Sequence, residues 1–299
     1  MNACKCWAAV LIAGLLLPNV AVSADAAKAA FDKGMTCLDK KDYDAAIAAF
    51  SEVIKLDPKN AEAYGNRGRA FARKGDLDKA FGDSNNAIRL NPKLALGYNV
   101  RGSIYGERGN LEKAISDLNE AIRLDPKYAT AYCNRGISYG KNGEYDKAVA
   151  DLSKSIRLEP KDAVTYFNRG LAYKAEHDYD KSIVDLTEAI RLDPQNSLAY
   201  QIRGDAYGSK GDHDKAIADY TDVVRLDPKN ADAYCNRGVA YRHKGELDKA
   251  IADYTEAIRL DPKMAVAYYD RGIAYQNKGD KATAEEDFEQ AMKLGYKPP

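Results

Sequence analysis

The chain has 299 residues, of which 45% are hydrophobic and 30% are charged, a balance typical of folded, soluble proteins. Its 45 basic and 45 acidic side chains give a formal net charge of zero, which argues against general binding to nucleic acid or to anionic membranes. Length alone would suggest about two domains, but that expectation fails for repeat proteins, so we examine periodicity first.

The first 24 residues differ from the rest of the chain. Lys5 gives a positive start, residues 8–17 form an uncharged apolar run, and Val22, Ser23 and Ala24 form the small-residue pattern after which signal peptidases cut. We interpret residues 1–24 as a secretory signal, because the apolar run is too short to indicate a membrane span. We therefore expect an exported protein, periplasmic or secreted, with no membrane span in the mature chain; the alternative is an uncleaved N-terminal anchor.

Proline recurs every 34 residues without a gap from Pro58 to Pro262. When this proline is counted as the thirty-second position, eight repeats fill the chain and leave no room for a linker or a second domain. The repeats span residues 27–60, 61–94, 95–128, 129–162, 163–196, 197–230, 231–264 and 265–298. The sequence therefore predicts that residues 25–299 form a single repeat domain.

Each repeat has the pattern of two helices. In the first half an aromatic residue, a glycine and another aromatic residue follow at spacings of 4 and 3, as in Tyr132, Gly136 and Tyr139, and these spacings form one helical stripe. The glycine recurs in all eight repeats, although it costs about 1 kcal/mol in mid-helix, so we expect close approach of the partner helix there.

The helix boundaries are also marked in the sequence. Six repeats have glycine at the fifteenth position, which ends the first helix, and every repeat then has an acid or asparagine, most of which are good N-caps for the second helix. The second helix stops before the proline, because the residue that precedes a proline is disfavoured in the helical region. The pattern predicts an all-α protein of helix–turn–helix repeats.

These residues carry a family resemblance. The pattern of aromatic residues, glycine, alanines and proline resembles the tetratricopeptide repeat, and it covers the whole mature chain; in the seventh repeat it comprises Tyr234, Gly238, Tyr241, Ala250, Tyr254, Ala257 and Pro262. The resemblance implies a right-handed α-solenoid superhelix of eight helix–turn–helix repeats whose first helices line a concave groove. Members of this family mostly bind peptides or protein segments there.

One position departs from the family pattern. The seventh position, usually leucine in the family, is arginine in seven repeats, and the same seven repeats have aspartate at the twenty-third position. This correlation predicts a structural ladder of partly buried ion pairs, because guanidinium binds carboxylate bidentately. The alternative is that these arginines bind acidic ligands in the groove. The predicted pairs are Arg67 and Asp83, Arg101 and Asp117, Arg135 and Asp151, Arg169 and Asp185, Arg203 and Asp219, Arg237 and Asp253, and Arg271 and Asp287.

The resemblance also implies which side chains face the groove. The predicted groove residues are asparagines at the sixth position, apolar side chains at the fifth and ninth, and basic side chains at the ninth, twelfth and thirteenth. They are Asn66, Asn134, Asn168 and Asn236; Phe167, Ile137 and Leu171; and Arg69, Arg73, Lys141, Lys174 and Arg242. An amide offers both donors and an acceptor to an extended peptide, and basic residues favour an acidic segment. The alternatives are solvated amides, half-buried apolar residues and a solvated basic rim.

The remaining chemistry-bearing residues suggest no enzyme. The odd set Cys37, Cys133 and Cys235 lies at long spacing and is no disulfide framework, and no histidine has a partner at metal-ligand spacing. We therefore predict no catalytic residues, no metal and no cofactor. The predicted function is a scaffold that binds a protein or peptide, with no nucleic-acid partner. The alternatives are a self-associating structural protein, which would be a homo-oligomer, and an accessory subunit that presents substrates to a separate enzyme.

Overall fold

A computed structural model describes residues 17–297 of the chain. Within this range it contains sixteen α-helices and no strand, which confirms the predicted all-α fold of eight helix–turn–helix repeats. The helices are α1 (Leu17–Asp39), α2 (Tyr43–Leu56), α3 (Ala61–Lys74), α4 (Leu77–Leu90), α5 (Ala95–Glu107), α6 (Leu111–Leu124), α7 (Ala129–Lys141), α8 (Tyr145–Leu158), α9 (Ala163–Ala175), α10 (Tyr179–Leu192), α11 (Ser197–Ser209), α12 (His213–Leu226), α13 (Ala231–His243), α14 (Leu247–Leu260), α15 (Ala265–Lys278) and α16 (Lys281–Lys293).

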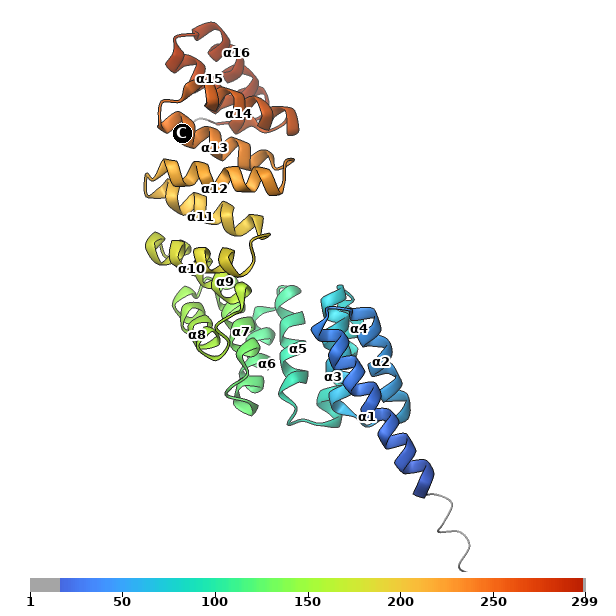
Figure 1. Cartoon of the computed structure of the whole chain (residues 1–299). Coiled ribbons are helices and arrows are strands. Elements are labelled where there is room, and N and C mark those ends of the chain that lie inside the picture. The colour runs from blue at the N-terminus through green and yellow to red at the C-terminus, as the bar shows by residue number, and fades with distance from the viewer. Residues whose placement is uncertain (1–16, 298–299) are drawn as a thin grey trace, which may run out of the picture. The chain divides into compact units, whose positions relative to one another are not determined.

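The helices belong to two compact units, and the chain passes from the first to the second between Gly143 and Glu144, inside the fourth repeat. The first unit contains α1–α7 and the second contains α8–α16. Within each unit the two helices of a repeat pack as a hairpin, and each hairpin packs against the next along the chain (Figure 1). First helices also contact one another: α3 with α5 and α5 with α7 in the first unit, and α9 with α11 and α13 with α15 in the second.

Turn chemistry explains where the helices begin and end. Gly75 ends α3 in the left-handed region at φ 86°, and the carboxylate of Asp76 then accepts a hydrogen bond from the Lys79 amide at the start of α4. Six second helices are capped in this way by aspartate or asparagine, whereas Glu144 and Glu246 make no such bond. The prediction that most of these residues cap the second helix is therefore confirmed, and the capping side chains are the shorter ones.

The glycine at the eighth position marks the closest approach of the two helices. A Cβ built on Gly102 would lie 2.8 Å from Leu118 Cγ and 3.2 Å from the carbonyl oxygen of Ala114 on α6. Such distances leave no space for a methyl group, so the close approach predicted from the repeated glycine is confirmed.

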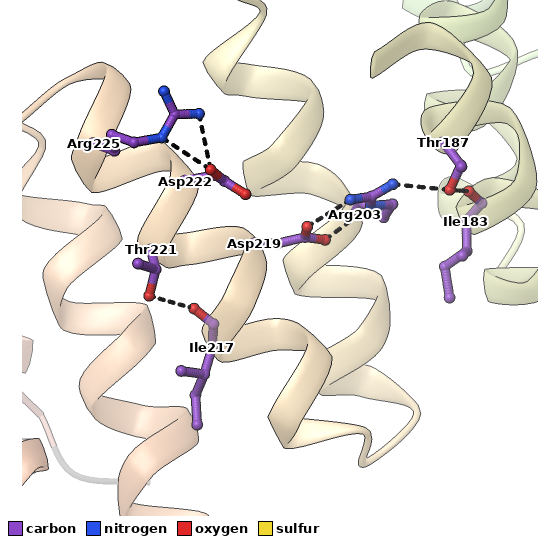
Figure 2. Close-up of polar contacts among 8 residues, drawn as sticks. All are labelled: Ile183, Thr187, Arg203, Ile217, Asp219, Thr221, Asp222 and Arg225. Carbon is purple, nitrogen blue, oxygen red and sulfur yellow. Dashed lines mark hydrogen bonds and ion pairs between the residues drawn. The ribbon is translucent and has the colours of Figure 1, made fainter. Parts of the chain in front are cut away.

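The arginine at the seventh position joins three helices. In the sixth repeat, Arg203 Nε and Nη2 donate to the two carboxylate oxygens of Asp219 at 2.9 and 2.7 Å, and Nη1 donates to Thr187 Oγ1 of the preceding repeat at 2.9 Å (Figure 2). The Thr187 hydroxyl in turn donates to the carbonyl oxygen of Ile183 on its own helix (Figure 2). The guanidinium also lies over the ring of Tyr200, 5.7 Å from its centroid. One side chain thus links both helices of its own repeat to the repeat before it.

The same arrangement recurs along both units. Bidentate Arg–Asp pairs form at Arg67–Asp83 and Arg101–Asp117 in the first unit, and at Arg169–Asp185, Arg203–Asp219, Arg237–Asp253 and Arg271–Asp287 in the second. Arg135 and Asp151 belong to different units, and their pair stays a prediction. The hydrogen bond with Asp83 raises the pKa of Arg67 above its ordinary value, which keeps its charge fixed at any working pH.

The acceptor in the preceding repeat was not predicted. It occupies the twenty-fifth position, and in seven repeats it is a serine, threonine or asparagine that accepts from Nη1 of the following arginine at 2.7–3.2 Å. The acceptors are Ser51, Asn85, Asn119, Ser153, Thr187, Thr221 and Thr255.

The predicted signal, residues 1–24, lies mostly outside the described residues. Its last part belongs to α1, which has 23 residues where the other helices have 13 or 14. Among residues 17–297, none of the helices combines the length and the apolar character needed to cross a membrane.

We predict that Asp185→Ala strongly destabilises the second unit. Asp185 is 3% exposed, and its loss would leave the partly buried Arg169 guanidinium without its carboxylate, at a cost of about 3 kcal/mol. Thermal unfolding followed by circular dichroism measures the change in Tm. The matched control is Glu188→Ala, one turn away on α10, which removes the exposed pair with Arg191 and should leave the Tm unchanged. Equal Tm values for the two variants would contradict the structural role of the ladder.

Candidate functional site

The first helices of the first unit line a cavity of about 320 Å³, which we call the α3–α5–α7 pocket. Each of three successive repeats contributes to it. Its lining residues are Arg69, Ala72 and Arg73 from α3; Asn99, Val100, Ser103 and Glu107 from α5; and Tyr128, Thr130 and Asn134 at the start of α7. The pocket therefore lies on the face that first helices share, where the resemblance places the groove.

A chain of hydrogen bonds builds one wall of this pocket. Asn134 Nδ2 donates to Asn99 Oδ1 at 3.0 Å, and Asn99 Nδ2 donates to the Tyr128 hydroxyl oxygen at 3.2 Å. Asn99 is only 5% exposed, so its amide is held in one orientation by Tyr128 at the end of its own repeat and by Asn134 of the next repeat. Sequence reasoning missed Asn99, which stands at the fifth position. Its polar amide among the mostly apolar side chains at this position was the available signal.

Two arginines of α3 also line the pocket. Arg69 is half-buried and Arg73 is exposed, one turn apart on α3. Within residues 17–297 neither guanidinium forms an ion pair or a hydrogen bond. The carboxylate of Glu107 lines the same pocket, also without an ion pair to another described residue. Both arginines are thus available to a ligand.

The other predicted basic residues are engaged by the protein itself. Lys141 Nζ donates to the carbonyl oxygen of Gly106 at 3.3 Å. Lys174 on α9 forms an ion pair with Asp205 on α11 at 2.7 Å. Arg242 on α13 lies 3.7 Å from Asp270 on α15, and burial raises the pKa of this aspartate although Arg242 opposes the effect. These carboxylate partners were not anticipated.

The predicted asparagine row is only partly available. Asn66 is 6% exposed and donates to the carbonyl oxygen of Glu62, and Asn168 donates to that of Val164, each on its own helix. Asn236 is half-buried. Of the four predicted asparagines, Asn134 alone lines the α3–α5–α7 pocket. The expectation that Asn66 faces a ligand is therefore corrected, because its side chain is buried against the helix that carries it.

Apolar side chains are exposed on the first helices of the second unit. Val164 on α9 and Leu198 on α11 are 54% and 49% exposed, and both stand at the second position of their repeats. The predicted Phe167, by contrast, packs against the buried core of this unit. Leu171 in the second unit and Ile137 in the first are half-buried. The exposed apolar side chains thus stand at the second repeat position, from which the predicted site included no residue.

Among residues 17–297, the cysteines and histidines show no reactive arrangement. Burial, followed by the charge of Asp270, raises the pKa of the Cys235 thiol to about 12, so little thiolate forms at neutral pH. The rings of His213 and His243 stack at 4.9 Å, and burial lowers the pKa of His243. Within the described residues, no group of three or more His, Cys, Asp or Glu side chains is arranged to hold a metal ion.

Comparison with known families decides the relationship. One tetratricopeptide repeat model matches residues 6–61, 31–95 and 202–265, a second matches 129–162 and 163–196, a third matches 253–286, and a TPR repeat model matches 102–143. The chain belongs to the tetratricopeptide repeat (TPR) family. Its repeat pattern and its helix pairs agree with this membership, and TPR proteins generally act as scaffolds for protein–protein interactions.

Solved TPR structures resemble this chain. MamA (residues 41 to the end) from Desulfovibrio magneticus RS-1 is 26% identical over 56% of this chain and 94% of its own, with a TM-score of 0.54. YrrB, described as a TPR protein with an unusual peptide-binding site, is 26% identical over 62% of this chain and 95% of its own, with a TM-score of 0.56. A TPR protein from Parabacteroides merdae is 23% identical over 84% of this chain and 99% of its own, with a TM-score of 0.52, and shows the shared fold. None of the curated proteins matches the sequence.

We predict that Asn99→Ala lowers the stability of the first unit by about 1–2 kcal/mol, because two hydrogen bonds in a mostly buried site lose their partner. Urea unfolding measures this change. Asn168→Ala is the matched control, because its amide bonds only to its own helix, and it should change stability by less than about 0.5 kcal/mol. An Asn99→Ala variant as stable as the control would mean that the hydrogen-bonded wall contributes nothing.

Proposed function

We propose that this TPR protein is a non-enzymatic scaffold that binds a short peptide segment of a partner protein, with the α3–α5–α7 pocket as a main contact. The observation that carries the proposal is a pocket built from three successive first helices whose two arginines have no partner among the described residues. Charged side chains that converge on a pocket and have no partner in the protein are typical of recognition sites.

The dimensions of the pocket favour an extended segment. Packed helices are about 8–10 Å apart, and an extended chain advances about 3.3 Å per residue. A peptide that crosses from α3 over α5 to α7 therefore needs about five or six residues. Asn134 uses one amide N–H on Asn99 and keeps its second N–H and its amide oxygen, and Ser103 donates to the carbonyl oxygen of Val100 and keeps its hydroxyl oxygen as an acceptor along this path.

Two further observations support the proposal. YrrB, a similar TPR protein, is described as having a peptide-binding site. The exposed side chains of Val164 and Leu198 give the first helices of the second unit an apolar surface of the kind that partners cover. We propose that this surface is a second contact for the same class of ligand.

The test is selection of peptides from a random library of about ten residues per member, displayed on phage and panned against the full chain. We expect enriched peptides with dissociation constants of about 1–100 μM, whose binding is lost in Ser103→Trp because the indole fills the pocket. Val184→Trp is the matched control, because this side chain is 68% exposed on a second helix, α10. A library without enriched peptides, or peptides that bind both variants equally well, would exclude the pocket as the binding site.

We further propose that residues 1–24 are an export signal, so that the scaffold acts in the periplasm or outside the cell. Cleavage after Ala24 would leave Asp25 as the first residue, and mass spectrometry of the exported chain measures this directly. Ala24→Tyr should block cleavage because the enzyme needs a small residue there, whereas Ala27→Tyr, beyond the site, should not. A full-length chain that stays inside the cell would refute the proposal.

A further inference from the structure

We propose that the segment bound in the α3–α5–α7 pocket is acidic, and that Arg69 and Arg73 bind its carboxylates. This inference rests on the proposed function, because it names the chemistry of the ligand that the pocket would accept. It is carried by the contrast between these two arginines and the other arginines from α3 to α6, most of which pair with a carboxylate.

Most other cations on α3–α6 already have a carboxylate. Lys74 on α3 pairs with Asp44, and Arg108, which follows α5, pairs with Asp78. Further pairs in this unit are Arg67–Asp83, Lys79–Asp76, Arg101–Asp117 and Arg123–Glu120. Arg69 is half-buried and its guanidinium has no anion among residues 17–297, so its donors are left for a ligand.

The two arginines are arranged to act together. They lie four residues apart on one helix, and both line the same cavity. Planar guanidinium groups bind carboxylates bidentately, with charge-assisted hydrogen bonds. The lining also contains one opposing charge, Glu107, so two cations minus one anion leave a net charge of +1. Glu107 makes the pocket selective for how the anionic groups are spaced along the ligand.

The second unit lacks this property. There, the cation of Lys174 is neutralised by Asp205 at 2.7 Å, and Arg242 faces Asp270. The exposed groups on its first helices include the apolar Val164 and Leu198. Recognition of an acidic segment is therefore a property of the α3–α5–α7 pocket.

A peptide fits these observations better than a nucleic acid. Proteins that bind single-stranded nucleic acid combine a basic groove with a series of aromatic rings on which bases stack. The pocket lining contains one aromatic residue, Tyr128, whose hydroxyl accepts from Asn99, and the whole chain has a net charge of zero. The wall of amides suits the donors and acceptors of a peptide backbone.

Fluorescence anisotropy with defined probes tests the inference on the full chain. The probes are a labelled peptide of about ten residues that alternates glycine and glutamate, the same peptide with glutamine for glutamate, and an oligoadenylate RNA of equal length. We expect the glutamate peptide to bind at least about tenfold more tightly than the glutamine peptide, and to weaken when salt rises from about 50 to about 300 mM.

Substitutions of the lining residues test whether the glutamate peptide binds in the pocket. Arg69→Gln and Arg73→Gln should each weaken binding of the glutamate peptide about tenfold, the loss expected for one charge-assisted contact. Glu107→Gln should strengthen it severalfold, a gain that damage to the fold would not produce. Lys174→Gln is the matched control, because its charge is already paired with Asp205, and it should bind like the wild type.

The outcomes separate this inference from the proposed function. If library-selected peptides bind but the glutamate peptide has no advantage over the glutamine peptide, the acidic preference is wrong and the scaffold function stands. If no peptide of any kind binds, both fail. Tighter binding of the RNA than of the glutamate peptide, lost in Arg69→Gln, would overturn the inference in favour of a nucleic acid.

Discussion

Contact between one hairpin and the next is the constraint on which the rest of this structure depends. A pair of helices of 13 or 14 residues has more apolar surface than the two helices cover between them, so the neighbouring hairpin has to cover the remainder. Glycines such as Gly102 let the helices approach closely enough for this burial. The stacking brings first helices side by side, and the α3–α5–α7 pocket exists because three of them share one face.

Ion pairing distinguishes the arginines that stabilise the fold from those that can bind a ligand. Each arginine of the ladder is surrounded by an aspartate of its own repeat, a polar side chain of the preceding repeat and an aromatic ring, as Arg203 illustrates. Its charge is therefore neutralised by a carboxylate of the protein itself. Arg69 and Arg73 have no carboxylate partner among the described residues. Their guanidinium groups can therefore form with a ligand the charge-assisted hydrogen bonds that the ladder arginines form within the protein.

Periodicity was sufficient to predict the helix pairs and their boundaries. Proline, glycine and short capping side chains act locally, so their positions determine where each helix ends whatever the neighbours are. The coincidence of arginine with aspartate likewise pointed to contacts that the structure contains, for example Arg67 with Asp83. The periodic signal is strong because each unit of the pattern is sampled eight times in one chain.

The details of the site could not be predicted in this way, because they depend on which side chains of adjacent repeats meet. The sequence predicted both Lys174 and Arg69 as basic groove residues. In the structure Asp205 of the next repeat pairs with Lys174, whereas Arg69 has no such partner among the described residues. Asn99 gained its role from Asn134, 35 residues further along. Side chains that differ between repeats are also the ones that give a groove its specificity. The export signal stays a prediction.

The acceptor at the twenty-fifth position has a consequence for how such an array can grow. An inner repeat carries the arginine that reaches backward and the hydroxyl or amide that receives the next arginine, as Arg203 and Thr221 do in the sixth repeat. A duplicated or transplanted inner repeat would therefore contain both the donor and the acceptor needed for hydrogen bonds to its two neighbours. Gene duplication can then lengthen the stack without compensating substitutions, leaving the groove residues free to diverge.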